Sequence, residues 1–168
     1  WTPPAGTWPP RLRRRTPPYK RKSERMGEHT YFLKAMDWTA AGTYYDEAHN
    51  AFPLRGSVRI LREPEWTLNG LLEVRSDPPV RFTNDYRIRQ AASPLTLEWT
   101  SFNPALGPLE GSFEFVGRSI LSAYRSQDGA YSGTEVLTLR EDGSYYNAGA
   151  AFRGGRRLSS WEAVLTPV

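Results

Sequence analysis

The residues that could do metal chemistry gather in one short segment. It reads YYDEAHN over residues 44–50 and brings Asp46, Glu47 and His49 close together. Carboxylate and imidazole groups are both common metal ligands. A polar hairpin loop between two strand-like segments explains the same residues more simply, so we predict no metal site.

Two further short segments are candidates for acid–base catalysis and for anion binding. Glu141 and Asp142 place two carboxylates side by side, and residues 153–157, RGGRR, could hold an anion. Each cluster coincides with an Asp-Gly or Gly-Gly pair, which is the strongest short signal for a hairpin turn. We therefore interpret both clusters as turns.

The sequence shows neither a cysteine nucleophile nor a serine–histidine arrangement for nucleophilic catalysis. The chain has no cysteine, which excludes disulfides, thiolate metal sites, cysteine nucleophiles and iron–sulfur clusters. Its two histidines, His29 and His49, do not accompany a Gly-x-Ser-x-Gly elbow. We assign no catalytic residue and expect a binding protein more than an enzyme.

The first 25 residues differ in composition from the rest of the chain. They contain eight of the 22 basic residues, one of the 18 acidic residues and six of the 14 prolines. Such a segment cannot bury enough apolar surface to offset the entropy lost on ordering. We expect residues 1–25 to be a disordered basic, Pro-rich extension. Residues 26–168, with 14 basic and 17 acidic residues, have the size of a single domain.

Strand-like segments recur about every ten residues through the remainder of the chain. Residues 27–38 have an approximately helical spacing of aromatic residues, but we favour a lead-in to the first strand over a short helix. The connections after residue 116 are tight and contain glycine, which indicates antiparallel hairpins. We predict strands at residues 42–47, 55–62, 66–75, 80–89, 95–102, 109–116, 118–126, 133–140, 144–152 and 157–165.

Short connections decide between the two common all-β architectures. A sandwich needs longer crossings between its sheets, whereas a local meander can close into a barrel and so remove its exposed edges. We predict an all-β, antiparallel up-and-down meander of about ten strands closed into a barrel, with at most one short N-terminal helix. The interior of such a barrel is either filled by side chains or holds one small ligand.

Alternation within each strand identifies the side chains that face the interior. In residues 80–88, for example, Val80, Phe82, Asn84 and Tyr86 share one face, opposite a face that carries arginines. Buried Tyr and Trp rings often need no ligand, because one hydrogen bond satisfies them. The inward polar and aromatic residues are nevertheless our candidates for ligand binding: Asn84, Tyr86, Trp99, Phe113, Ser122, Tyr124 and Trp161.

Residues 38–165 resemble the calycin group, the β-barrels of the lipocalin and fatty-acid-binding-protein type. The resemblance is one of architecture and depends on strand number, hairpin spacing and Trp38 near the first strand. In place of the Gly-x-Trp that opens many lipocalins, the chain has Asp37-Trp38. The resemblance implies carriage, storage or sensing of a small hydrophobic or amphipathic molecule inside the barrel.

Cofactor expectations follow from the positions of the histidines, and membrane and localisation expectations follow from the lack of long apolar runs. Nitrobindins, which are ten-stranded haem-binding barrels, use a histidine late in the chain, whereas His29 and His49 are early, so we expect no haem and no other cofactor. No run of about 18 apolar residues occurs, so no transmembrane segment is expected. No secretory signal is visible, and we expect a cytoplasmic protein.

Two alternative functions stay open. A barrel can act as a cofactor-independent cyclase or isomerase, because holding a small molecule in one orientation and excluding water can accelerate its reaction. The basic extension could also make the protein an interaction module attracted to nucleic acid or membrane. A charge block without a folded reader gives only salt-sensitive binding, so we expect no specific nucleic acid.

Overall fold

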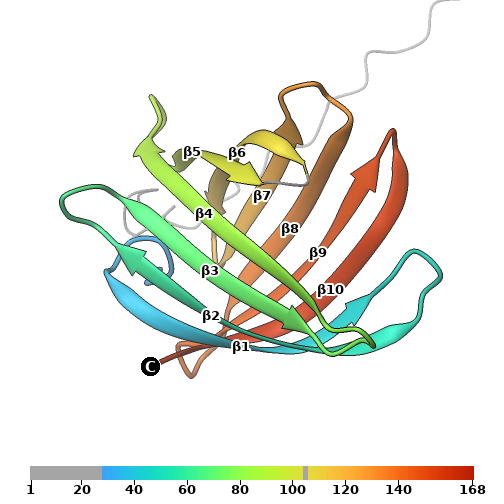
Figure 1. The fold of residues 1–168 in the computed structure, drawn as a ribbon. Coiled ribbons are helices and arrows are strands. Elements are labelled where there is room, and N and C mark those ends of the chain that lie inside the picture. The colour runs from blue at the N-terminus through green and yellow to red at the C-terminus, as the bar shows by residue number, and fades with distance from the viewer. Residues whose placement is uncertain (1–27, 104–105) are drawn as a thin grey trace, which may run out of the picture.

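The computed structural model describes residues 28–103 and 106–168 of the chain, and they form one closed barrel of antiparallel strands (Figure 1). Each strand pairs with its neighbours in sequence, and β1 also pairs with β10 to close the barrel. The described residues contain no helix. The predicted ten-stranded meander is therefore confirmed. The strands are β1 (Met36–Tyr45), β2 (Ala51–Leu61), β3 (Thr67–Val74), β4 (Val80–Gln90), β5 (Thr96–Asn103), β6 (Gly107–Val116), β7 (Ser119–Ser126), β8 (Tyr131–Leu139), β9 (Tyr145–Arg153) and β10 (Arg156–Pro167).

Alternating side chains explain why these segments form a barrel wall. In β4, Phe82 and Tyr86 face inward, while Arg81 lies on the outer face and pairs with Glu73 of β3 at 3.0 Å. The inner face removes apolar surface from water, which is the main driving force for folding. Such exposed ion pairs contribute little to stability, so the inner face determines the register.

The first strand begins earlier than the sequence pattern indicated. β1 starts at Met36, not at residue 42, and Trp38 and Ala40 lie inside the barrel with 1% and 4% exposure. Thr39 and Ala41, each of which follows one of these two residues, lie on the outer face. The alternation is present, but Ala and Thr give it too little contrast to mark the strand from sequence.

The segment before β1 closes one end of the barrel. Tyr31 and Phe32 are buried there, and the ring of Phe32 stacks on Phe113 with centroids 3.9 Å apart. The carbonyl oxygen of Phe32 accepts a hydrogen bond from Trp66 Nε1 at 2.9 Å. These residues, which we call the plug (residues 28–35), fill the interior beside the β6–β7 connection. The expected lead-in thus packs as part of the core.

The plug is held by a hydrogen-bond network around His29. The Tyr145 hydroxyl accepts a hydrogen bond from the backbone N–H of Thr30 at 3.0 Å, and His29 Nδ1 lies 3.1 Å from the same oxygen. His29 Nε2 then donates to the Gly117 carbonyl at 3.0 Å. Burial lowers the pKa of His29 and so favours the neutral imidazole, in which Nε2 carries the proton and Nδ1 accepts a hydrogen bond from the Tyr145 hydroxyl.

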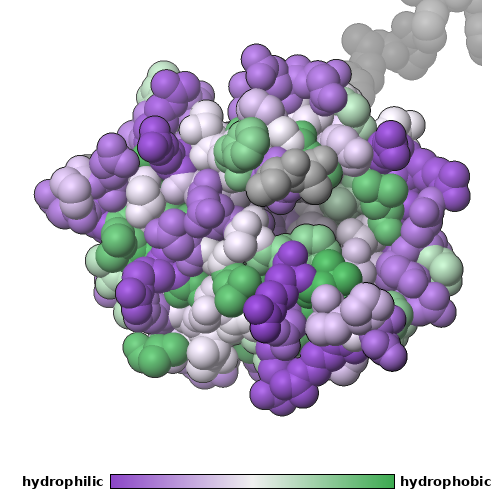
Figure 2. Space-filling model, in the orientation of Figure 1, coloured by the Kyte–Doolittle hydropathy of each residue, from purple (hydrophilic) through white to green (hydrophobic). Residues whose placement is uncertain are grey.

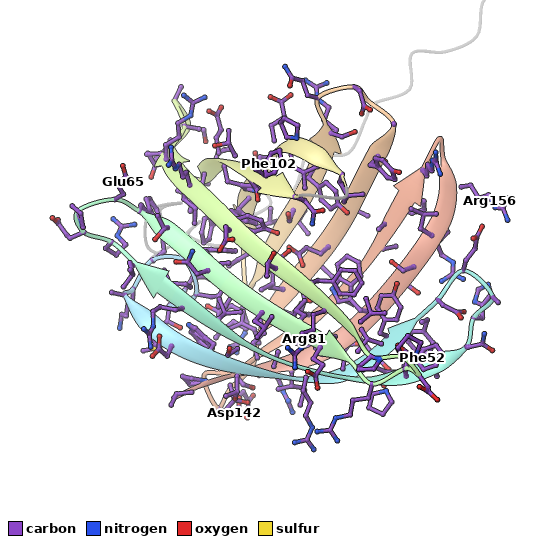
Figure 3. All side chains as sticks on the ribbon, viewed as in Figure 1. Phe52, Glu65, Arg81, Phe102, Asp142 and Arg156 are labelled. Atoms are coloured by element: carbon purple, nitrogen blue, oxygen red, sulfur yellow. The ribbon has the colours of Figure 1, made fainter. Side chains whose placement is uncertain are left out.

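The other end of the barrel is less completely paired. β4 pairs with β5 only between Tyr86 and Gln90, so residues 80–85 have no partner on β5. Figure 3 shows Asp142 and Arg156 on turns at opposite ends of the barrel.

In the described part of the chain, no helix is long and apolar enough to cross a membrane.

Candidate functional site

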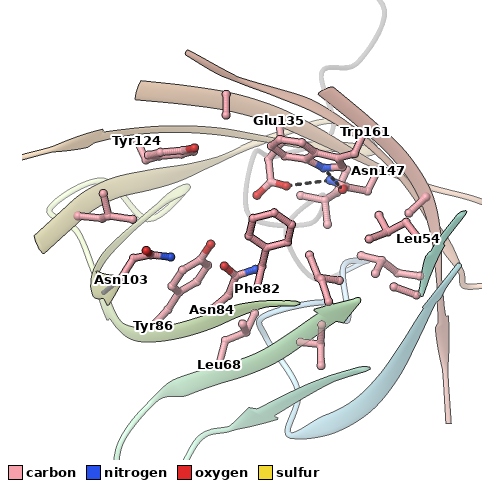
Figure 4. Close-up of a pocket in the computed structure, with 18 of the residues that line it drawn as sticks. Leu54, Leu68, Phe82, Asn84, Tyr86, Asn103, Tyr124, Glu135, Asn147 and Trp161 are labelled. Carbon is pink, nitrogen blue, oxygen red and sulfur yellow. Dashed lines mark hydrogen bonds between the residues drawn. The ribbon is translucent and has the colours of Figure 1, made fainter. Parts of the chain in front are cut away.

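A cavity of about 220 Å³ lies inside the barrel, on the far side of the plug (Figure 4). Tyr31 and Phe32 of the plug contribute to its lining, and Asn103 and Leu106 contribute from the region of the β5–β6 connection. Aliphatic and aromatic side chains from all around the barrel make up most of the rest. Figure 2 shows the molecular surface hollowed on one face. The barrel is therefore not packed solid.

Three aromatic rings lie flat against the wall because each one faces a glycine on the next strand. Trp99 pairs with Gly111, Tyr124 with Gly133 and Trp161 with Gly149. A Cβ atom at any of these glycines would overlap the facing ring. Glycine thus gives each ring the space to lie along the wall, which is one reason that the centre of the barrel stays open.

A hydrogen-bonded chain of three side chains crosses the cavity wall on β8, β9 and β10. Asn147 Oδ1 accepts a hydrogen bond from Trp161 Nε1 at 2.8 Å, and Asn147 Nδ2 donates to Glu135 Oε2 at 3.0 Å. The indole can only donate, so it fixes the orientation of the amide. Asn147 consequently presents an N–H group to the carboxylate, and Figure 4 shows all three side chains around the cavity.

The barrel interior raises the pKa of Glu135. Its carboxyl faces the cavity and keeps some accessible surface there, but protein surrounds it on the other sides. Desolvation raises the pKa of Glu135, while Asn147 and the neighbouring Ser122 favour the charged form and offset part of this rise. The hydroxyl of Ser122 is itself buried without a hydrogen-bond partner of acceptable geometry among the described residues. Hydrogen bonds thus offset only part of the desolvation cost of the charged form of Glu135.

Other polar groups face the cavity without protein partners. Among the described residues, no hydrogen bond satisfies the hydroxyls of Tyr86 and Tyr124 or the side-chain amide of Asn84, and all three residues line the cavity. Burial, and secondly the charge of Glu135, raise the pKa of Tyr124 to about 12. The hydroxyl of Tyr124 therefore keeps its proton and can donate or accept a hydrogen bond.

The seven residues that we predicted as ligand contacts fall into two groups, those inside the barrel wall and those that line the cavity. Phe113 is fully buried against Phe32, and Ser122 is buried beside Glu135, so both lie in the wall behind the cavity surface. The remaining five line the cavity, namely Asn84, Tyr86, Trp99, Tyr124 and Trp161.

Sequence reasoning missed Glu135, Asn147 and Asn103, which also line the cavity. Glu135 shares its face of β8 with Leu137, so the period-two pattern would place it inside once the inner face of β8 is known. It was overlooked because acidic side chains are almost never buried unless paired. The mixed polarity of β8 and β9 made their inner faces ambiguous.

The polar clusters considered for other chemistry are explained by loop structure. Asp46 accepts hydrogen bonds from the backbone and side chain of Asn50, both at 2.8 Å, and Glu47 pairs with Arg156 at 2.6 Å. Gly154 and Gly155 have φ values of 55° and 80°, as a tight hairpin turn requires. Asp142 accepts hydrogen bonds from Ser144 within its turn. The predicted basic extension, residues 1–25, lies outside the described residues.

Fold and cavity together define a class, the closed up-and-down β-barrels with an internal cavity that is mostly apolar and, among the residues that the structure describes, carries one acidic group. This architecture is compatible with the calycin group. The sequence matches no protein-family model and no curated protein.

Proposed function

We propose that the protein binds a small, mostly apolar molecule inside the barrel, as a carrier, store or sensor. The observation that carries this proposal is the cavity of about 220 Å³ into which Asn84, Tyr86 and Tyr124 direct polar groups that no described residue satisfies. Asn84, Tyr86 and Tyr124 are partly exposed, so water reaches their polar groups in the cavity, and a bound molecule with one or two polar atoms would replace that water as their hydrogen-bond partner.

The size of the cavity limits the ligand. Drug-sized molecules usually occupy pockets of about 300 to 1,000 Å³, whereas an engineered apolar cavity of about 150 Å³ binds benzene. A cavity of about 220 Å³ therefore suits a molecule with one ring and a short chain. Apolar burial would supply most of its affinity, and the polar groups would orient it.

A neutral probe of this size tests the proposal. We expect 2-phenylethanol to bind the full-length protein and to change the fluorescence of the tryptophans, because Trp99 and Trp161 line the cavity. Native mass spectrometry of the purified protein should detect a co-purifying small molecule, or the probe after its addition. Failure of both measurements would contradict the proposal.

Filling the cavity provides the matched control. Ala151 lines it from β9, and Ala151→Phe adds a ring there. We expect the affinity for 2-phenylethanol to fall at least about tenfold, while circular dichroism reports the same fold. If Ala151→Phe does not fold, Ala151→Leu fills less volume and should weaken binding in the same direction. If neither variant changes the affinity for 2-phenylethanol, the probe binds outside the cavity.

A second function, cofactor-independent isomerisation, is favoured by Glu135 itself. An acid whose pKa is raised by burial can exchange a proton with a bound molecule, and the Tyr124 hydroxyl can donate to an oxygen that gains negative charge. Phenylacetone in D₂O provides the test: the Glu135 carboxylate would remove an α-proton, the carboxyl proton would exchange with D₂O, and a deuteron would return to the same carbon. Exchange no faster than with Glu135→Gln would exclude this function.

A further inference from the structure

The ionisable charge that the described residues give the cavity lining is negative, without a positive group to balance it. Within the described part of the chain, Glu135 is the sole Asp or Glu that lines the cavity, and no Lys, Arg or His lines it. The five ion pairs given by the described residues all lie on the outer surface. The carboxylate of Glu135 therefore has no cationic partner of its own, although it is enclosed by the barrel.

Unpaired buried charges are costly, and one hydrogen bond from Asn147 compensates only part of that cost. Asn147 donates its hydrogen bond to Glu135 Oε2, so Glu135 Oε1 is the oxygen that can accept from a further donor. A cationic group that entered the cavity would convert an unfavourable buried charge into an ion pair.

The rest of the lining is suited to the same kind of group. Tyr44, Phe82, Tyr86, Tyr124 and Trp161 surround the cavity with aromatic rings. The faces of such rings attract cations, and more strongly where water is excluded. Figure 4 shows Glu135 on the same side of the cavity as Tyr124 and Trp161, with Phe82 opposite. Carboxylate and aromatic walls together recognise an ammonium group joined to an apolar body.

We infer that the ligand of this barrel is a small primary amine with an aromatic or apolar body, whose ammonium group pairs with Glu135. This inference depends on the proposed function and narrows it to one ligand class. It also predicts discrimination against carboxylic acids, because a carboxylate would meet Glu135 without any cation to neutralise it. Fatty acids are thereby excluded as ligands.

Three probes with the same ring and chain length separate the possibilities. We would measure their affinities for the full-length protein at pH 8 by calorimetry: 2-phenylethylamine, 2-phenylethanol and phenylacetate. A hydrogen bond between charged groups is expected to favour the amine at least about tenfold over the alcohol. Phenylacetate should bind most weakly.

Glu135→Gln keeps the shape of the side chain and still accepts a hydrogen bond from Asn147. We expect it to bring the affinities for 2-phenylethylamine and 2-phenylethanol within about threefold of each other, because the amide has no charge to pair with the ammonium group. Glu162→Gln is the matched control, because Glu162 lies on the outer face of β10. That variant should keep the full preference.

The outcomes separate this inference from the proposed function. Binding of 2-phenylethanol as tightly as the amine would overturn the amine assignment and leave a ligand-binding barrel. An amine preference that survives in Glu135→Gln would also overturn it, because a surface site would then be responsible. Failure of all three probes to bind would overturn the proposed function as well.

Discussion

The side-chain amide of Asn147 on β9 faces the carboxylate of Glu135 on β8, with 3.0 Å between Nδ2 and Oε2. The two residues are diagonal neighbours, since Glu135 pairs directly with Gly149 and Asn147 with Leu137. Trp161 holds the amide from the other side. This contact places an oriented donor beside the acid that the described residues contribute to the cavity lining, and it can be tested separately from any ligand.

Loss of the Asn147 amide should destabilise the protein. Asn147→Leu leaves both Trp161 Nε1 and Glu135 without their buried partner, and we expect the free energy of unfolding to fall by about 1–3 kcal/mol. Urea denaturation measures this change. The control is Asn69→Leu, which removes an exposed amide–carboxylate contact to Asp85 of 2.9 Å and should cost no more than about 0.5 kcal/mol. Equal losses would contradict a special role for Asn147.

Glu135 should make stability depend on pH in a defined direction. Because burial raises the pKa of Glu135, the folded state keeps its proton at pH values where the unfolded state has lost it. Its contribution is fully present below the unfolded pKa of about 4.3 and is lost as pH rises through the folded pKa. The free energy of unfolding of Glu135→Gln, relative to wild type, should therefore increase with pH through this window. A constant difference between the two proteins would contradict the raised pKa.

Gly149 should be required for the position of Trp161. A Cβ at residue 149 would lie 2.5 Å from Trp161 Cζ2, so Gly149→Ala must displace the indole towards the cavity. We expect a loss of about 1–3 kcal/mol in unfolding free energy and weaker binding of 2-phenylethanol. Gly70→Ala is the control, because its Cβ would have no neighbour closer than 3.5 Å. Equal effects at both positions would show that the indole does not depend on the glycine.

The plug should depend on one hydroxyl. Tyr145→Phe removes the group that joins His29 to the backbone N–H of Thr30, and buried donors without partners cost about 1–3 kcal/mol. Hydrogen exchange at residues 29–32 should become faster. Tyr146→Phe removes a hydroxyl that contacts Glu162 on the outer face, and it should change neither measurement. A stable Tyr145→Phe protein with slow exchange would show that packing alone holds the plug.

Tyr124 and Asn84 should matter for the ligand more than for the fold. Both direct polar groups into the cavity without described partners, so Tyr124→Phe and Asn84→Ala break no hydrogen bond between described residues. We expect affinity for the probe amine or alcohol to fall about threefold to tenfold, with the free energy of unfolding changed by less than about 1 kcal/mol. Parallel losses of affinity and stability would assign both residues to the core.

The sequence was sufficient for the barrel because the information is local. Period-two alternation, as in Phe82, Asn84 and Tyr86, assigns each side chain to a face, and glycine-containing turns such as Gly154-Gly155 join neighbouring strands. Both signals extend over a few residues and do not require knowledge of the rest of the chain. The number of strands, their antiparallel order and five of the cavity-lining residues were predictable for that reason.

Only the tertiary structure decided that the barrel holds a cavity and that Glu135 faces it. The cavity volume depends on side chains from all ten strands, on the plug that fills one end, and on rings such as Trp161 that lie flat over a facing glycine. The raised pKa of Glu135 likewise comes from solvent exclusion by distant parts of the chain. Neither property is encoded in a local pattern, because each is a sum over residues that meet only after the barrel has closed.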